Sequence, residues 1–157
     1  TMAQVALMLP DDRSRALLET VTELLVMDEP RRRIAGMMSG LDITYDLGEG
    51  HPLLGRRMPD LDLQTAGGTT RVAALLHAAR PVLLDLAAPS EVDLTGWEDR
   101  VEVVEARVDG RWELPVVGEV PAPTAVLVRP DGHVAWAGDP AGGSLRAALT
   151  TWFGAAA

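Results

Sequence analysis

The sequence predicts an α/β fold in which a mixed central sheet is flanked by helices and preceded by an N-terminal helical pair. Three features of the 157-residue chain lead to this expectation. Residues 121–136 contain a proline-rich entry into an apolar run, a Pro-Asp-Gly turn and a second alternating run, which is the pattern of a β-hairpin. Residues 81–87 form a continuous apolar run, as expected of a central strand buried on both faces. Helical spacing of apolar residues dominates residues 11–39 and returns after residue 144.

Residues 1–40 are expected to form a helical N-terminal segment. Asp11 or Asp12 can cap its first helix, which extends to residue 28. Pro30 suits the first turn of a second helix, because its missing N–H costs nothing there, and Gly40 closes that helix. Its buried stripe is predicted to consist of Ile34, Met37 and Met38. Two helices cannot bury both apolar faces alone, so we expect them to pack on a neighbour, either the following domain or a part outside this chain.

A connector is expected over residues 41–59, because glycines and prolines gather there and apolar periodicity is lost. A domain follows over residues 60–157. Its predicted elements are a short strand with Leu61 and Leu63, a turn at Gly67-Gly68, a helix over 72–79, a central strand over 81–87, a turn or short helix over 89–99, a strand over 101–108, a hairpin over 124–137, and a helix capped by Ser144 that extends to Phe153.

This order, a βαβ unit followed by a ββα unit, is the thioredoxin-like arrangement. Pro123 directly precedes a strand and resembles the proline that thioredoxin-like folds hold as the cis isomer, so the Ala122–Pro123 bond is predicted to be cis. Gly132 ends the predicted hairpin turn. The chain has no cysteine, which excludes disulfides, thiolate metal sites and thiol redox chemistry.

Asp85 lies inside the central apolar run, where an unpaired charge is costly. It can be a relic of the acid that assists the thiols in thioredoxin-like proteins, an edge-facing residue or the partner of an arginine, and these structural explanations are preferred to a functional one. The following loop offers Ser90 and Glu91. No histidine partner is identifiable near Ser90, so a helix cap is the better interpretation than a nucleophile.

No catalytic, cofactor-binding or metal-binding residue is predicted. The three histidines, His51, His77 and His133, share no metal-ligand spacing. The sequence contains neither a G-x-G-x-x-G fingerprint nor a P-loop. The net charge of −9 disfavours nucleic acid and acidic membrane surfaces as partners. No apolar run is long enough to span a bilayer and no secretory signal is visible, so a cytoplasmic location is expected.

Two stretches carry a resemblance to a known family. The segments Met38–Tyr45 and His51–Asp60 resemble the connector into the C-terminal domain of FAD-dependent aromatic hydroxylases. These are flavoprotein monooxygenases of the phenol hydroxylase type, especially those that oxidise aromatic polyketides. Val128–Trp136 resembles the hairpin near the end of the same domain. In that family this domain is thioredoxin-like, lacks the redox cysteines and performs no chemistry itself.

The resemblance implies a parent enzyme that uses FAD, NAD(P)H and O₂ to hydroxylate a phenolic polycycle. Its cofactors bind to N-terminal domains, so none is expected in this chain. The implied role is support: covering the flavin and substrate domains, stabilising them or mediating a homodimer contact. One alternative is a free-standing, redox-inactive thioredoxin-like adaptor. The least supported alternative is a small enzyme that uses Asp85, Glu91 or His133.

Overall fold

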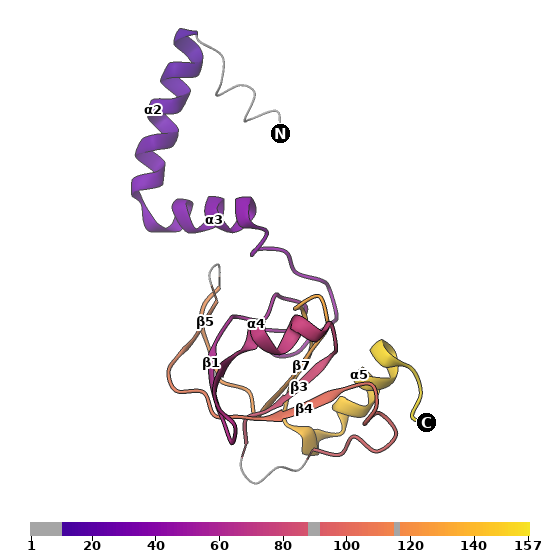
Figure 1. Cartoon of the computed structure of the whole chain (residues 1–157). Coiled ribbons are helices and arrows are strands. Elements are labelled where there is room, and N and C mark those ends of the chain that lie inside the picture. The colour runs from indigo at the N-terminus through magenta and orange to yellow at the C-terminus, as the bar shows by residue number, and fades with distance from the viewer. Residues whose placement is uncertain (1–10, 88–91, 115–116) are drawn as a thin grey trace. The chain divides into compact units, whose positions relative to one another are not determined.

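The computed structural model describes residues 11–87, 92–114 and 117–157 (Figure 1). The chain divides into two compact units, Thr1–Asp42 and Ile43–Ala157. In the described ranges, no helix combines the length and apolar character needed to cross a membrane.

The first unit contains the two predicted helices, α2 (Asp12–Val26) and α3 (Asp28–Ser39). Asp11 caps α2 as predicted, because its carboxylate accepts a hydrogen bond of 2.8 Å from the Ser14 amide. The predicted end of α3 is also confirmed: Gly40 adopts a left-handed φ of 72° and its N–H bonds to the Gly36 carbonyl.

The apolar residues of this helical pair are largely exposed. Met37 and Met38, which were expected in a buried stripe, are 56% and 77% exposed, and only Ile34 of that stripe is half-buried. The reason is geometric, since α3 follows α2 at a bend instead of lying alongside it (Figure 1). The other large apolar side chains exposed on α2 and at the bend are Leu17, Leu18, Leu24, Val26 and Met27.

The second unit is organised around a four-stranded sheet with the order β4-β3-β7-β8. The strands are β3 (Val82–Asp85), β4 (Glu102–Glu105), β7 (Ala125–Val128) and β8 (Val134–Gly138). β3 pairs in parallel with β4 and antiparallel with β7, and β7 pairs antiparallel with β8. Every residue of β3 and β7 is buried, which confirms the predicted central strand and hairpin.

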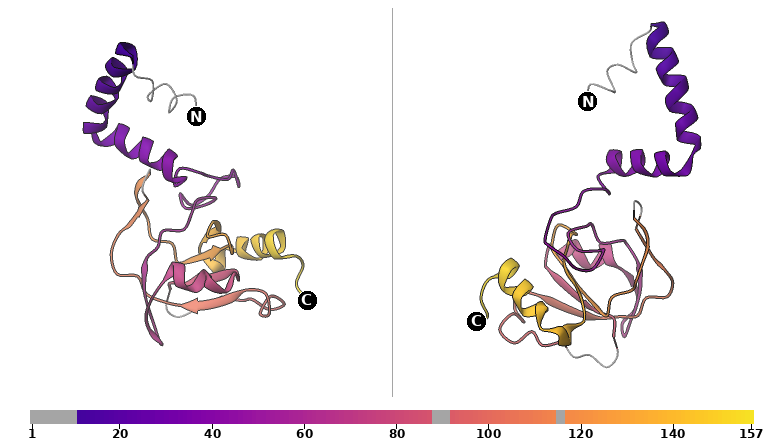
Figure 2. Two further views of the ribbon diagram at one scale, coloured as in Figure 1. Left: turned by 45° about the horizontal axis from the view of Figure 1, so that its top comes forward. Right: turned by 180° about the vertical axis from the view of Figure 1, so that it is seen from behind.

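Alternate residues of the central strands face two apolar clusters. Val82 and Leu84 pack with Val72 and Leu75 of α4 (Val72–Leu75) and with Leu76 of the 3₁₀ turn η1 (Leu76–Ala78). Leu83 packs on the opposite face with Leu149 of α5 (Ser144–Phe153), which follows the 3₁₀ turn η2 (Pro140–Gly142). The sheet is therefore covered by helix on both faces (Figures 1 and 2).

Two small antiparallel pairs complete the unit. β1 (Asp62–Thr65) pairs with β2 (Gly68–Arg71), and β5 (Trp112–Leu114) pairs with β6 (Gly118–Val120). The sequence predicted β1 and the turn after it, but the return strand β2 and the whole β5–β6 pair were missed. β2 carries polar side chains, which give no strand periodicity.

The N-terminal end of α5 differs from the prediction. Gly143 is the N-cap residue and Ser144 is the first helical residue, without a side-chain capping bond. The Ser144 hydroxyl instead accepts a hydrogen bond of 2.8 Å from the indole N–H of Trp136. The predicted Ser144 cap is therefore wrong, because a buried tryptophan donor takes the oxygen that a cap would use.

Residues 44–58 cover the outer edge of β8. Gly55 donates to the Val134 carbonyl at 3.0 Å, the Val134 amide donates to Arg56 at 2.8 Å, and Met58 donates to Gly132 at 2.8 Å. Leu53 of this segment is fully buried. An edge strand with free backbone groups invites pairing with another chain, and this segment satisfies those groups internally.

We predict that Gly55→Ala lowers the free energy of unfolding by about 2–4 kcal/mol in urea titrations. Gly55 has a φ of +74°, and a Cβ added there would lie 2.0 Å from the Tyr45 carbonyl oxygen. Gly48→Ala is the matched control, since Gly48 has a φ of +88° but no atom within 4 Å of an added Cβ. It should cost only the backbone strain, about 1 kcal/mol. Equal losses would contradict a steric role for the close approach at Gly55.

Candidate functional site

Asp85 ends β3 and is 2% exposed. Its Oδ1 accepts a hydrogen bond of 3.2 Å from the Ala87 amide, while its Oδ2 has no hydrogen-bond partner among the residues that the structure describes. β3 is an interior strand, so Asp85 does not face an edge of the sheet. Within the same described residues, no arginine forms an ion pair with it. Its neighbours in the sequence, Ser90 and Glu91, lie outside the described residues.

Pro123 and Gly132 lie on either side of β7. Pro123 is buried two residues before the start of β7, and the cis isomer of its peptide bond stays a prediction. Gly132 has a φ of +82° and donates to the Arg129 carbonyl at 2.9 Å, while the Arg129 amide donates to His133 at 2.8 Å. These bonds define a three-residue hairpin loop in which the last position needs a left-handed backbone, which glycine adopts without strain.

A cationic and aromatic cluster surrounds this turn. We call Tyr45, Arg129, Asp131, His133 and Trp152 the Arg129 cluster. The guanidinium carbon of Arg129 lies 4.3 Å from the ring centroid of Trp152 and 5.3 Å from that of Tyr45. Its Nη2 donates to Asp131 at 2.6 Å. One arginine thus joins the segment before β1, the hairpin turn and the end of α5.

His133 belongs to the same cluster and is 7% exposed. Its ring meets the Tyr45 ring edge to face, with centroids 4.9 Å apart. Its Nδ1 lies 3.5 Å from Asp131 Oδ2 and makes no hydrogen bond within the described chain. The arginine already holds that carboxylate, and no nucleophile accompanies the histidine in the cluster. This arrangement supports packing and gives no acid–base or nucleophilic machinery.

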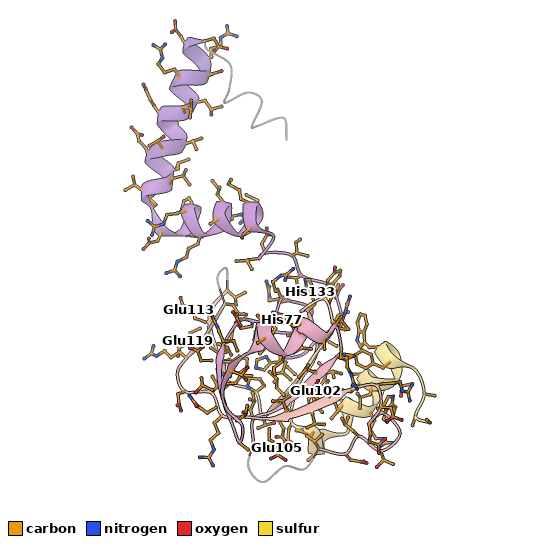
Figure 3. The ribbon with its side chains drawn as sticks, in the orientation of Figure 1. His77, Glu102, Glu105, Glu113, Glu119 and His133 are labelled. Atoms are coloured by element: carbon orange, nitrogen blue, oxygen red, sulfur yellow. The ribbon has the colours of Figure 1, made fainter. Side chains whose placement is uncertain are left out.

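The remaining titratable groups are dispersed. Figure 3 shows His77 in the 3₁₀ turn η1, Glu102 and Glu105 on β4, and Glu113 and Glu119 on the β5–β6 pair. No group of three or more potential metal ligands comes together in the described residues. His51 is bonded through both ring nitrogens, to the nearby Leu53 amide at 3.2 Å through Nδ1 and to the distant Pro121 carbonyl at 3.0 Å through Nε2.

The carboxyl of Asp93 has a pKa below its ordinary value. Hydrogen bonds from the Thr95 hydroxyl at 2.6 Å and the Thr95 amide at 2.9 Å lower the pKa of its carboxyl. The Arg146 guanidinium, 3.0 Å away, acts in the same direction. Asp93 therefore stays ionised and links the loop after β3 to the first turn of α5.

A groove of about 350 Å³ runs between residues 47–54 and α5. Its walls include Leu47, Leu54, Trp136 and Ala147. The groove does not fit FAD: it offers no glycine-rich turn between a strand and a helix for the pyrophosphate, and Glu49 adds an acid to its wall. No chemistry is therefore assigned to a flavin in this chain.

Sequence reasoning missed the Arg129 cluster. The turn at Pro130-Asp131-Gly132 was recognisable, but nothing in the spacing of Tyr45, Arg129 and Trp152 indicates that they meet. The cluster depends on how residues 44–58 fold back along β8, a tertiary arrangement without a local sequence signal.

The comparisons with known proteins agree on a single family. The family model described as aromatic-ring hydroxylase, C-terminal, matches residues 51–156. A 12-dehydrotetracycline 5-monooxygenase/anhydrotetracycline 6-monooxygenase of Streptomyces rimosus is 44% identical over 98% of this chain and 31% of its own length. A rifampicin monooxygenase of Streptomyces venezuelae is 37% identical over 99% of this chain and 29% of its own length.

The solved structures extend the likeness to the fold. The OxyS anhydrotetracycline hydroxylase of Streptomyces rimosus superimposes with a TM-score of 0.84 and 42% identity, over 100% of this chain and 32% of that one. CabE, an aromatic hydroxylase from angucycline biosynthesis, gives a TM-score of 0.83 and 47% identity over the same shares. This is the class of C-terminal domains found in aromatic-ring hydroxylases. The chain belongs to that family, and it spans about 30% of the length of the relatives it matches.

We predict that Arg129→Met lowers the free energy of unfolding by about 1–2 kcal/mol, because it removes a partly desolvated cation from two aromatic faces and a carboxylate. Arg111→Met is the control. Arg111 pairs with Glu119 at 3.0 Å on an exposed surface, where such pairs contribute little, so its loss should change stability by less than about 0.5 kcal/mol. Urea titrations of both variants measure this difference, and similar values for the two would contradict the anchoring role of Arg129.

We also predict that Asp85→Asn leaves stability at pH 7 unchanged or raises it by up to about 1 kcal/mol, since it removes a buried, unpaired carboxylate oxygen. The amide oxygen of asparagine can still accept from Ala87. Asp139→Asn is the matched control, because Asp139 makes the same bond to a backbone amide two residues on, at 3.0 Å to Ala141, on the surface. A loss above about 1 kcal/mol in thermal or urea unfolding of Asp85→Asn alone would mean that Asp85 has a favourable partner.

Proposed function

We propose that this chain is the non-catalytic C-terminal domain of an FAD-dependent aromatic hydroxylase, an NAD(P)H- and O₂-dependent monooxygenase of aromatic polyketides located in the cytoplasm. The proposal rests on how much of each relative this chain matches. Relatives match almost the whole chain but only about 30% of their own length, within a family model for the C-terminal part. The domain's role is structural, or it forms an interface with the flavin and substrate domains.

The arrangement of the polar residues that the structure describes supports this role. Its described acids and histidines are dispersed or engaged in packing, and the sequence has no dinucleotide fingerprint. FAD and NAD(P)H therefore belong to the rest of the parent enzyme. In such an enzyme the flavin supplies the oxygen-transfer chemistry, and this domain's residues act only on the stability and placement of neighbouring parts.

The variety of reactions among the relatives also supports it. A dialkyldecalin synthase of Streptomyces rugosporus is 38% identical over 100% of this chain. The Diels-Alderase PyrE3 superimposes with a TM-score of 0.70 and 37% identity. The same portion thus accompanies proteins named as hydroxylases and proteins named for a cycloaddition. A portion that recurs with different chemistries is better explained as a scaffold than as a reaction centre.

The topology supports the thioredoxin-like assignment that this proposal includes. β3 runs parallel to β4, β7 and β8 form the antiparallel hairpin beside β3, and α5 follows the hairpin. The buried Pro123 stands two residues before β7, at the position proposed for the cis-proline. With no cysteine in the chain, the fold keeps the packing surfaces without the redox pair.

The N-terminal helical pair is the proposed contact with the other domains. Leu17, Leu18 and Leu24 of α2 are each more than 40% exposed, as are Met37 and Met38 of α3. Apolar surface of this kind is stabilised when it is covered. In the proposed enzyme it packs against the substrate and flavin domains, and a homodimer contact is the second use that it can serve.

We predict that the purified chain binds neither FAD nor NADPH with measurable affinity and does not oxidise NADPH in the presence of FAD and phenolic substrates. Flavin fluorescence and absorbance at 340 nm measure this. The reading frame upstream of Met2 separates the proposal from a free-standing adaptor, because a parent hydroxylase must encode a glycine-rich strand-turn-helix there. Tight flavin binding by the chain alone would overturn the proposal.

A further inference from the structure

The loop from Val92 to Val101 binds the main chain that follows α5. Arg100 donates from Nη1 to the Phe153 carbonyl at 2.6 Å and from Nη2 to the Ala155 carbonyl at 2.7 Å. The indole N–H of Trp97 donates to the Gly154 carbonyl between them at 2.9 Å. Three successive carbonyls are thus bound by two side chains from one loop. The last carbonyls of a helix have no partners inside the helix, so these donors replace water at that end.

The bonding is reciprocal at the far end of the tail, residues 154–157. The Ala157 amide donates to the Gly96 carbonyl at 3.0 Å, and Arg100 Nη2 also donates to that carbonyl at 2.6 Å. Gly96 has a φ of +89°, and a Cβ added there would lie 2.6 Å from the Ala156 Cβ. The tail therefore passes so close to the loop that only glycine fits at residue 96.

The same loop holds the other end of α5. Asp93 pairs with Arg146 at 3.0 Å, and the Arg146 guanidinium lies 5.0 Å from the ring centroid of Trp97. Trp97 is buried against the apolar face of α5 that carries Leu145 and Leu149. The loop thus contacts the first turn of α5, its buried face and the chain beyond its last turn.

We propose that loop 92–101 is a binding site for an extended main chain with small residues, occupied by the protein's own tail, and that it acts as a latch for α5. The latch consists of Trp97 and Arg100 bound to residues 153–157. The latch binds the backbone carbonyls of its ligand. It therefore selects a segment with small side chains and does not depend on the charge of that segment. When the tail is bound, the C-terminal end of α5 stays hydrogen-bonded to the loop, and Trp152 is held against Arg129.

The latch predicts local opening of α5 without loss of the sheet. We expect Arg100→Gln to raise amide hydrogen exchange about tenfold or more in the segment 144–157. The substitution removes the charge-assisted bonds to the carbonyls of Phe153, Ala155 and Gly96. Exchange in β3 and β7 should not change. Arg80→Gln is the matched control, since Arg80 donates one bond of 3.0 Å to the Asp99 carbonyl of the same loop without touching the tail.

A double-variant comparison tests whether Arg100 acts through the tail. Gly96→Ala should displace the tail, because the added Cβ would lie 2.6 Å from the Ala156 Cβ, and it should show the same increase in exchange over α5. Combining it with Arg100→Gln should add less than about twofold, since both changes disrupt the same contact between loop and tail. Additive increases would overturn the latch. So would an increase spread evenly over β3, β7 and α5, or an effect of Arg80→Gln as large as that of Arg100→Gln.

Discussion

The burial of β3 and β7 on both faces is the constraint on which the second unit depends. All eight positions of these two strands are buried, and each face must be covered by something apolar. α4 with its neighbouring loops covers one face and α5 covers the other. Burial of this kind contributes roughly 25 cal/mol per Å² of apolar surface, so the two faces together dominate the folding energy of the unit. The cover on the α5 face consists of that single helix and the apolar side chains of the loop 92–101.

Polar contacts explain how that helix is held. Arg129 lies against Trp152 at the last turn of α5, Arg146 joins the first turn to Asp93, and Arg100 binds the carbonyls beyond the helix. Each arginine uses the planar, always charged guanidinium to meet an aromatic ring, a carboxylate or a carbonyl. The abundance of arginine therefore has structural uses here. The charged side chains act at the ends of a helix whose middle is held by apolar packing.

The sequence predicts the elements whose signal is local. The β7–β8 hairpin follows from its Pro-Asp-Gly turn, β3 from its unbroken apolar run, and the end of α3 from Gly40, because each depends on neighbouring residues. What it could not predict depends on distant residues. Ser144 was expected to cap α5, yet its hydroxyl is taken by Trp136 of β8. The polar strand β2 carries no periodicity of its own and forms because β1 lies opposite it.

In the candidate site, too, local features could be predicted from the sequence and contacts between distant residues could not. That the chain lacks thiol redox chemistry follows from the missing cysteines alone, whereas the use made of the remaining polar residues required the structure. Asp85, Tyr45 and His133 each suggest chemistry in isolation. In the part of the fold that the structure describes, Asp85 has one oxygen without a hydrogen-bond partner, and Tyr45 and His133 pack around an arginine. Catalysis needs convergent groups with complementary roles, and the described residues converge instead on holding segments together. Such an arrangement is what the proposed scaffold role requires, because a domain that stabilises its neighbours can accompany different reaction centres.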